Sequence, residues 1–293
     1  MFKRFQEAYR EARQEGRERG KNVNVKFVFR RHEQPGIDEK AGTPMDFLTE
    51  AGVELAKKTG RELPQDAYLM VAGSRGVKRA RESGGHMLGS FRDEAGAAAI
   101  VNREMSGEQQ EKMGHGKIPP GDVVIYRSGD LDPEKGFSII RGAARQEGVA
   151  KELPAVVDWW LANQNKTRDL GAPALEDIAA EMAHRLTVGV NMSGKLYEGL
   201  DVRFENLTHG PKLVAFLKEV LLKKDGTRGF EKLEEIGGMV KPGEAVEIDI
   251  KRDEKGRMDM KLKFRGKEYD IDQKRLLELV DLYRQQHPVQ NVE

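Results

Sequence analysis

The chain has 293 residues, enough for one large domain or two small ones with a sizeable hydrophobic core. Its 50 basic and 49 acidic side chains leave a net charge of +1, so no global field favours nucleic acid or an anionic membrane, and any anion must be held by local geometry. The absence of cysteine excludes disulfides, thiolate metal sites and a cysteine nucleophile, and it fits a reducing compartment.

Residues 1–22 form a charged segment in which basic side chains alternate with acids from Glu7 to Glu18. A secretory signal needs an apolar centre and an organellar transit peptide avoids acids, so we expect a cytoplasmic protein. Phe2, Phe5 and Tyr9 follow one another at spacings of three and four, which predicts an amphipathic helix or a frayed extension. We interpret this segment as a solvated N-terminal extension.

The first predicted core strand runs from Val23 to Arg30 and leads directly into Arg31 and His32. An apolar run followed at once by cations and an imidazole indicates an anion site, because open α/β sheets bind ligands at the carboxyl ends of their strands. The alternative is a strand that simply exits into solvent through charged residues.

A loop from Glu33 to Asp46 precedes the first predicted helix of the core. Thr49 is a suitable N-cap, and Gly60 suits the helix's C-terminal exit. The residues that recur at helical spacing are expected to share one face of this helix, namely Leu48, Ala51, Leu55 and Thr59.

A second buried strand, Ala67 to Ala72, leads into a glycine-containing loop and then a basic helix that carries Arg79. Strand and helix alternate twice in this part of the chain, which predicts parallel strands joined by right-handed crossovers. Both arginine-rich strand ends would then lie at one edge of the sheet. Taken alone, Arg79 would be a solvated helix residue, and its position after a buried strand makes it a candidate.

The middle of the chain is harder to interpret. The apolar runs at 97–101 and 123–126 are predicted strands, and much of 105–170 is predicted to form an insertion over the sheet edge. Leucine, isoleucine and methionine then recur with a 3.6-residue period between Leu175 and Leu186, which predicts a helix.

A later strand, Val202 to Leu207, ends on Thr208-His209-Gly210-Pro211, and Pro211 suits the first turn of a following helix. This repeats the arrangement of the opening strand, with histidine at the strand exit. Alternating apolar residues on either side of Asp253–Gly256 predict a C-terminal β-hairpin, and Asp272 is expected to cap a last helix.

Taken together, these residues resemble the histidine phosphatase superfamily, in its phosphoglycerate mutase-like branch. The resemblance covers roughly residues 23–225 and rests on four short segments in the right order, namely Phe29–His32, Leu48–Gly52, Val77–Ser83 and Thr208–Gly210. It implies an α/β/α three-layer domain with a mostly parallel sheet over 23–293, including the insertion and the C-terminal hairpin with its helix.

The resemblance also implies a set of roles. His32 would be the nucleophile that accepts the phosphoryl group, Arg31 and Arg79 would clamp its oxygens, and His209 would be a second imidazole on the same oxygens. Glu104 would be the proton donor, with Asp93 and Glu94 as competitors. No metal or other cofactor is implied.

This chain departs from the family pattern at two positions. The family has glycine directly after the nucleophilic histidine, whereas Glu33 stands here, and a carboxylate beside a dianionic substrate would repel it unless it points away or pairs with Arg30. Arg75 stands in place of the usual serine of the second arginine motif, and it would add a cation.

The predicted function is metal-independent hydrolysis of a small-molecule or protein phosphomonoester through a phosphohistidine. Glu33 motivates an alternative, a catalytically silent family member that binds a phosphorylated ligand or protein. A mutase that moves phosphate within a sugar acid is a third possibility. No nucleic acid or membrane partner is expected, and the sequence leaves the oligomeric state and the substrate open.

Overall fold

The computed structural model describes residues 5–38, 43–64, 68–73, 78–91 and 133–287. These residues fall into two compact units. The first contains the described residues up to Phe91, together with Gly189–Thr208 and Pro242–Asp259, and the second contains the rest.

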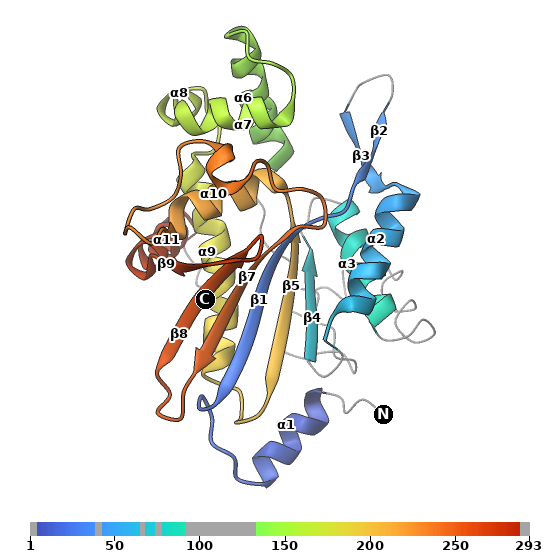
Figure 1. Cartoon of the computed structure of the whole chain (residues 1–293), viewed down its shortest axis with the longest axis vertical. Helices are drawn as coiled ribbons and strands as arrows, with labels where there is room; N and C mark the ends of the chain where they lie inside the picture. The colour runs from blue at the N-terminus through green and yellow to red at the C-terminus, as the bar shows by residue number, and fades with distance from the viewer. Residues whose placement is uncertain (1–4, 39–42, 65–67, 74–77, 92–132, 288–293) are drawn as a thin grey trace, which may run out of the picture. The chain divides into compact units, whose positions relative to one another are not determined.

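The first unit is built on four strands in the order β4-β5-β1-β7. Strands β4, β5 and β1 are parallel, and β7 is antiparallel to β1 (Figure 1). Their bounds are β1 Val23–Arg31, β4 Tyr68–Gly73, β5 Asp201–Thr208 and β7 Ala245–Arg252. The first and second predicted strands are parallel, as expected, and the late strand lies between them.

Helices cover this sheet on two faces. A Cβ added to Gly84, in α3 (Lys78–Phe91), would meet Val71 and Leu207, whereas one added to Gly189, near the end of α9 (Leu175–Ser193), would meet Phe27. Successive strand side chains alternate between faces, and in the paired register Leu207 and Phe27 belong to opposite faces. The fold is therefore α/β, with helical layers on both sides of a sheet whose core is parallel, as expected.

The helix after the first loop, α2 (Glu50–Glu62), begins as predicted, because the Thr49 hydroxyl accepts a hydrogen bond from the Gly52 N–H at 3.0 Å. The face that the helix buries differs from the one predicted from helical spacing, although Leu48, just before the helix, is buried. The buried residues are Gly52, Ala56 and Gly60, while Leu55 is 41% exposed. Small residues line this face because α3 approaches so closely that a Cβ on Gly60 would lie 1.9 Å from the Met87 carbonyl oxygen.

Two segments near the N-terminus differ from the expectation. Strands β2 (Pro35–Asp38) and β3 (Thr43–Leu48) form a small antiparallel sheet where we expected a loop. Helix α1 (Phe5–Gln14) is not simply solvated, because Ala12 is buried and the Tyr9 hydroxyl donates to the Lys195 carbonyl at 3.1 Å.

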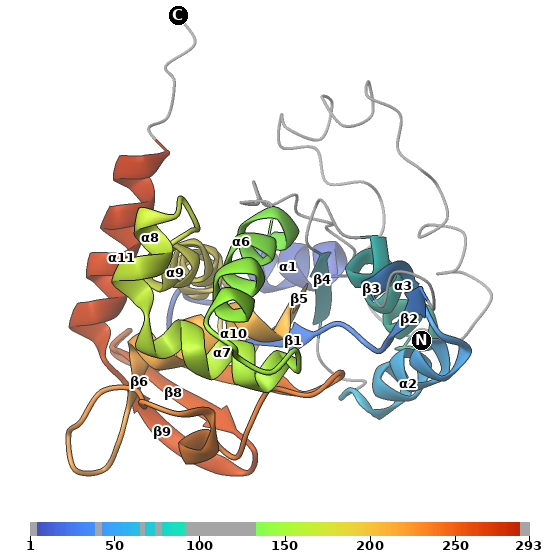
Figure 2. The ribbon, with the colours of Figure 1, turned by 90° about the horizontal axis from the view of Figure 1, so that it is seen from above.

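The second unit contains most of α9, further helices and three antiparallel strands in the order β8-β9-β6. Arg275 joins three of its helices through ion pairs with Glu176 and Glu219, and Figure 2 shows α9 and α11 next to each other. The remaining bounds are α6 Pro133–Gln146, α7 Leu153–Ala162, α8 Gln164–Asp169, α10 Gly210–Val220, α11 Gln273–Gln286, the 3-10 helix Leu233–Ile236, β6 Leu221–Leu222, β8 Met258–Phe264 and β9 Lys267–Ile271.

Asp272 caps α11 as predicted, accepting a hydrogen bond from the Arg275 N–H at 2.9 Å. The predicted turn at Asp253–Gly256 is also present, closed by a 2.9 Å hydrogen bond from the Gly256 N–H to the Asp253 carbonyl. None of the helices that the structure describes is long and apolar enough to cross a membrane.

The contact between α2 and α3 predicts opposite effects for two glycine substitutions. Gly60→Ala should lower the free energy of unfolding by about 1–3 kcal/mol, because its methyl group would collide with the rigid Met87 backbone. Gly89→Ala on α3 has nothing within 4 Å and should stabilise the fold by about 0.5–1 kcal/mol, since alanine is the better helix former. Urea denaturation of both variants tests this, and equal stabilities would contradict the close approach.

Candidate active site

The carboxyl ends of β1 and β5 bring the first candidate residues together at one edge of the sheet. Arg31 ends β1 and pairs in register with Thr208, the last residue of β5. The His32 N–H donates to the Thr208 carbonyl at 2.9 Å, which continues the strand pairing for one more residue. Arg79, the second residue of α3, reaches the same place, as its hydrogen bond to His32 shows.

The His32 imidazole is held in one tautomer. Its Nδ1 lies 2.7 Å from the Glu33 carbonyl oxygen, and a carbonyl oxygen can only accept a hydrogen bond. Nδ1 therefore carries the proton, which leaves the lone pair on Nε2. Consistently, Arg79 Nε donates to His32 Nε2 at 3.2 Å. The ring thus presents a nucleophilic nitrogen to a guanidinium group.

Burial and charge keep this imidazole neutral. His32 is 4% exposed, and burial lowers its pKa to about 4, an effect to which the positive charges of Arg79 and Arg31 add. At pH 7 the Nε2 lone pair is therefore available rather than protonated. A neutral, fixed imidazole beside two cations is suited to attack an electrophile that carries negative charge.

The two arginines form a cationic pair that favours an anion. Burial lowers the pKa of Arg31, and the nearby charge of Arg79 lowers it further, while Glu244 acts in the opposite direction. Two guanidinium groups close enough to influence each other repel, and a bound phosphoryl group would relieve that repulsion. Planar guanidinium forks also match phosphate oxygens in geometry.

Glu33, the departure from the family pattern, is buried within the electrostatic influence of Arg30. The residue is 1% exposed, its N–H donates to the Ser83 hydroxyl at 3.0 Å, and its carboxyl packs against Gly243, where a Cβ would lie 2.8 Å from Oε2. Burial raises the pKa of Glu33 to about 7, and the Arg30 charge opposes that rise. The carboxyl therefore occupies a space that a glycine at position 243 provides.

Arg30 itself is fixed by a network of charges. It makes bidentate hydrogen bonds to Glu205, from Nε at 3.0 Å and from a terminal nitrogen at 3.2 Å. It also donates a hydrogen bond to the Gly243 carbonyl at 2.8 Å. Glu205 is fully buried and also accepts from Arg203, which in turn binds Glu247. This network ties β1 to β5 and β7 and sets the place of the Gly243 backbone against Glu33.

His209 belongs to the second unit, where it is the N-cap residue of α10. It is 8% exposed, and its carbonyl accepts from the Leu213 N–H at 3.1 Å. Pro211 occupies the first turn as predicted, and Lys212 in that turn forms a buried ion pair with Glu181 of α9 at 2.9 Å. The ion pair holds the start of α10, and thus the backbone at His209, against α9.

The remaining candidates lie outside the described residues. These are Glu104, its competitors Asp93 and Glu94, and the additional cation Arg75, together with the strands expected at 97–101 and 123–126. Within the expected insertion, the described residues 133–170 form the helices α6, α7 and α8.

Sequence reasoning missed Ser83 and Gly243, which support Glu33 from either side. Ser83 follows Arg79 by four residues and so shares a helix face with it, a spacing that could have identified it. Nothing in the local sequence connects Gly243 with a residue 210 positions earlier.

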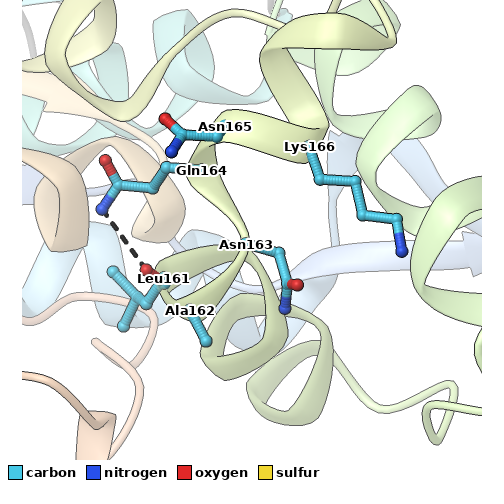
Figure 3. Close-up of a pocket in the computed structure, with 6 residues that line it drawn as sticks. All are labelled: Leu161, Ala162, Asn163, Gln164, Asn165 and Lys166. Carbon is cyan, nitrogen blue, oxygen red and sulfur yellow. Dashed lines mark hydrogen bonds between the residues drawn. The ribbon is translucent and has the colours of Figure 1, made fainter.

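A shallow pocket in the second unit lies where α7 meets α8 and is lined by Leu161–Lys166 (Figure 3). Three of its polar side chains already have partners. The Gln164 side chain donates to the Leu161 carbonyl at 3.3 Å, the Asn163 side chain donates to the Trp159 carbonyl at 2.8 Å, and Lys166 pairs with Glu147. We assign no ligand to it.

Comparison with solved structures finds similarity to three kinds of phosphate-handling protein. A phosphoglycerate mutase from Bacillus anthracis str. Sterne is 13% identical over 89% of this chain and 98% of its own, with a TM-score of 0.44. A mycobacterial glucosyl-3-phosphoglycerate phosphatase is 15% identical over 82% and 98%, with a TM-score of 0.41. A Hafnia alvei phytase is 10% identical over 84% of each chain, with a TM-score of 0.37.

These proteins are members of the histidine phosphatase superfamily, the one that the motifs of this chain resemble. No protein-family model and no curated protein matches the sequence.

The lowered pKa of His32 predicts a pH-dependent stability. The unfolded chain binds a proton at His32 below about pH 6.5, whereas the folded chain does so only near pH 4. The neutral imidazole therefore contributes to folding stability above pH 6.5, and this stability is lost as the pH falls toward 4. Between pH 7 and 4.5 the wild type should lose about 2–3 kcal/mol more of its unfolding free energy than His32→Asn. Urea titrations at both pH values test this, and parallel losses would show that His32 is solvated.

Glu33 predicts the opposite pH dependence, because its pKa is raised in the folded state. The contribution of Glu33 to folding stability is complete below about pH 4.5, and it is lost as the pH rises through 7. Glu33→Gln, which stays neutral, should therefore gain stability relative to wild type between pH 5 and 8, by about 1–2 kcal/mol after allowance for solvent screening. A gain that does not change with pH would indicate that Glu33 is ionised throughout.

Proposed function

We propose that this protein hydrolyses phosphomonoesters through a phosphohistidine at His32, without a metal ion. The observation that carries the proposal is the fixed tautomer of His32. The hydrogen bond from Nδ1 to the Glu33 carbonyl leaves the Nε2 lone pair directed at Arg79, in a ring whose low pKa keeps it neutral.

In the first step the Nε2 lone pair attacks phosphorus and the ester P–O bond breaks. The leaving oxygen takes a proton from a carboxylic acid, for which Glu104 is the proposed donor. Nδ1 keeps its proton and its bond to the Glu33 carbonyl throughout, so the imidazole remains oriented while it carries the phosphoryl group. Arg79 Nε, released from Nε2, can then donate to a phosphoryl oxygen.

In the second step water attacks phosphorus, and the same acid, now a carboxylate, accepts the water proton. The P–N bond breaks, inorganic phosphate leaves, and the neutral imidazole is restored. Arg31 and Arg79 neutralise the charge that spreads over the phosphoryl oxygens in both steps. We assign His209 to the same oxygens as a further hydrogen-bond donor.

The position of Glu33 removes the objection to hydrolysis that this residue raised in the sequence. A carboxylate directed at the bound phosphoryl group would oppose binding, but the cation that acts on Glu33 is Arg30, and the carboxyl packs against Gly243. The substrate is proposed to be a small-molecule or protein phosphomonoester in the cytoplasm, a setting that the lack of cysteine supports.

The test is phosphate release from a panel of phosphomonoesters at pH 5 to 8 in the presence of a chelator. Wild type should turn over, and His32→Ala should lose at least about 10³-fold in kcat/KM, because the nucleophile is removed. His287→Ala, which changes a histidine to which we assign no role, is the matched control and should retain activity.

Turnover that vanishes on chelation, or that survives in His32→Ala, would contradict the mechanism. Phosphate binding by the wild type without any turnover would instead favour the silent binding protein.

A further inference from the structure

Thr208 has a buried hydroxyl group that none of the described residues satisfies. The residue is 1% exposed, and its Oγ1 has no hydrogen-bond partner among them. Buried polar side chains are nearly always hydrogen-bonded, so such an atom calls for an explanation.

Other buried hydroxyl groups in this protein do have partners. Ser83 accepts from the Glu33 N–H at 3.0 Å, Thr167 donates to the Gln164 carbonyl at 2.9 Å, and Ser193 donates to the Val190 carbonyl at 2.7 Å. Thr208 differs from them in place, because it is the last residue of β5 and stands at the carboxyl edge of the parallel strands.

The register of the sheet places the Thr208 side chain beside that of Arg31 in the candidate site. Thr208 is the partner of Arg31 in the parallel pairing of β1 with β5, and directly opposed residues project from the same face of a sheet. The Thr208 carbonyl also accepts the His32 N–H at 2.9 Å. The side chain of Thr208 is therefore a cross-strand neighbour of Arg31 and one hydrogen bond away from the backbone of His32.

We infer that the Thr208 hydroxyl donates a hydrogen bond to a non-bridging oxygen of the phosphoryl group that Arg31 binds at His32. This inference rests on the proposed function and adds a substrate-binding residue to it. A hydroxyl is a suitable third donor here because it adds no positive charge to a pair of arginines that already repel each other. The anion would supply the partner that the described residues do not provide.

The test compares Thr208→Val, which keeps the side-chain shape without the hydroxyl, with Thr208→Ser, which keeps the hydroxyl. The valine variant should lose about 10- to 100-fold in kcat/KM, the range for a hydrogen bond to a charged group, and inorganic phosphate should inhibit it correspondingly less. The serine variant should remain within about threefold of wild type. The melting temperature of the valine variant should not fall, since none of the described residues bonds to this hydroxyl.

Thr167→Val is the matched control, because it removes a buried hydroxyl that does have an internal partner. It should lower the melting temperature and leave kcat/KM and phosphate inhibition unchanged. Should Thr208→Val fail to fold, Thr208→Ala removes the same hydroxyl without adding bulk, and the same kinetic losses are expected of it.

The outcomes separate the inference from the function on which it rests. A wild type that neither turns over phosphomonoesters nor binds phosphate would overturn both. An active wild type, with kcat/KM and phosphate inhibition unchanged in Thr208→Val, would overturn the role of Thr208 alone and leave the phosphohistidine mechanism in place.

Discussion

One hydrogen bond determines what the site can do, the bond from His32 Nδ1 to the carbonyl oxygen of Glu33. Because the acceptor is a backbone carbonyl, it cannot change its role with pH, and the imidazole is held with its lone pair on Nε2. The same bond positions the ring against Arg79. The backbone at Glu33 must in turn be held, and it is, by the bond from its N–H to Ser83 on α3.

The charges around this bond are separated by the sheet. Arg30 and Arg31 are neighbours in sequence, so their side chains project from opposite faces of β1. Arg30 donates hydrogen bonds to Glu205 and to the Gly243 carbonyl, and its charge acts on Glu33. Arg31 instead lies within the electrostatic influence of Arg79 and His32. Glu33 follows the end of β1, and the positive charge that acts on its carboxyl is that of Arg30 rather than that of the arginines that would bind phosphate.

The strand exits could be predicted from the sequence because each is a local pattern. Each of these features depends on residues within a few positions of one another. They are the apolar run that ends on Arg31-His32, the N-cap at Thr49 and the proline in the first turn after His209. What could not be predicted depends on contacts between distant residues. The face of α2 was mistaken because Gly60 serves a close helix approach rather than a helix end, and the accommodation of Glu33 depends on a glycine 210 residues away.

The central claim is that phosphate passes through Nε2 of His32, and the most direct measurement is to trap the intermediate. Wild-type protein would be mixed with a phosphomonoester, quenched under alkaline conditions within milliseconds, digested, and analysed by mass spectrometry and phosphorus NMR. The account predicts phosphate on the peptide that contains His32, attached to Nε2 and lost in acid. Phosphate on Nδ1 or on another residue, or a chain that turns over without ever becoming phosphorylated, would contradict it.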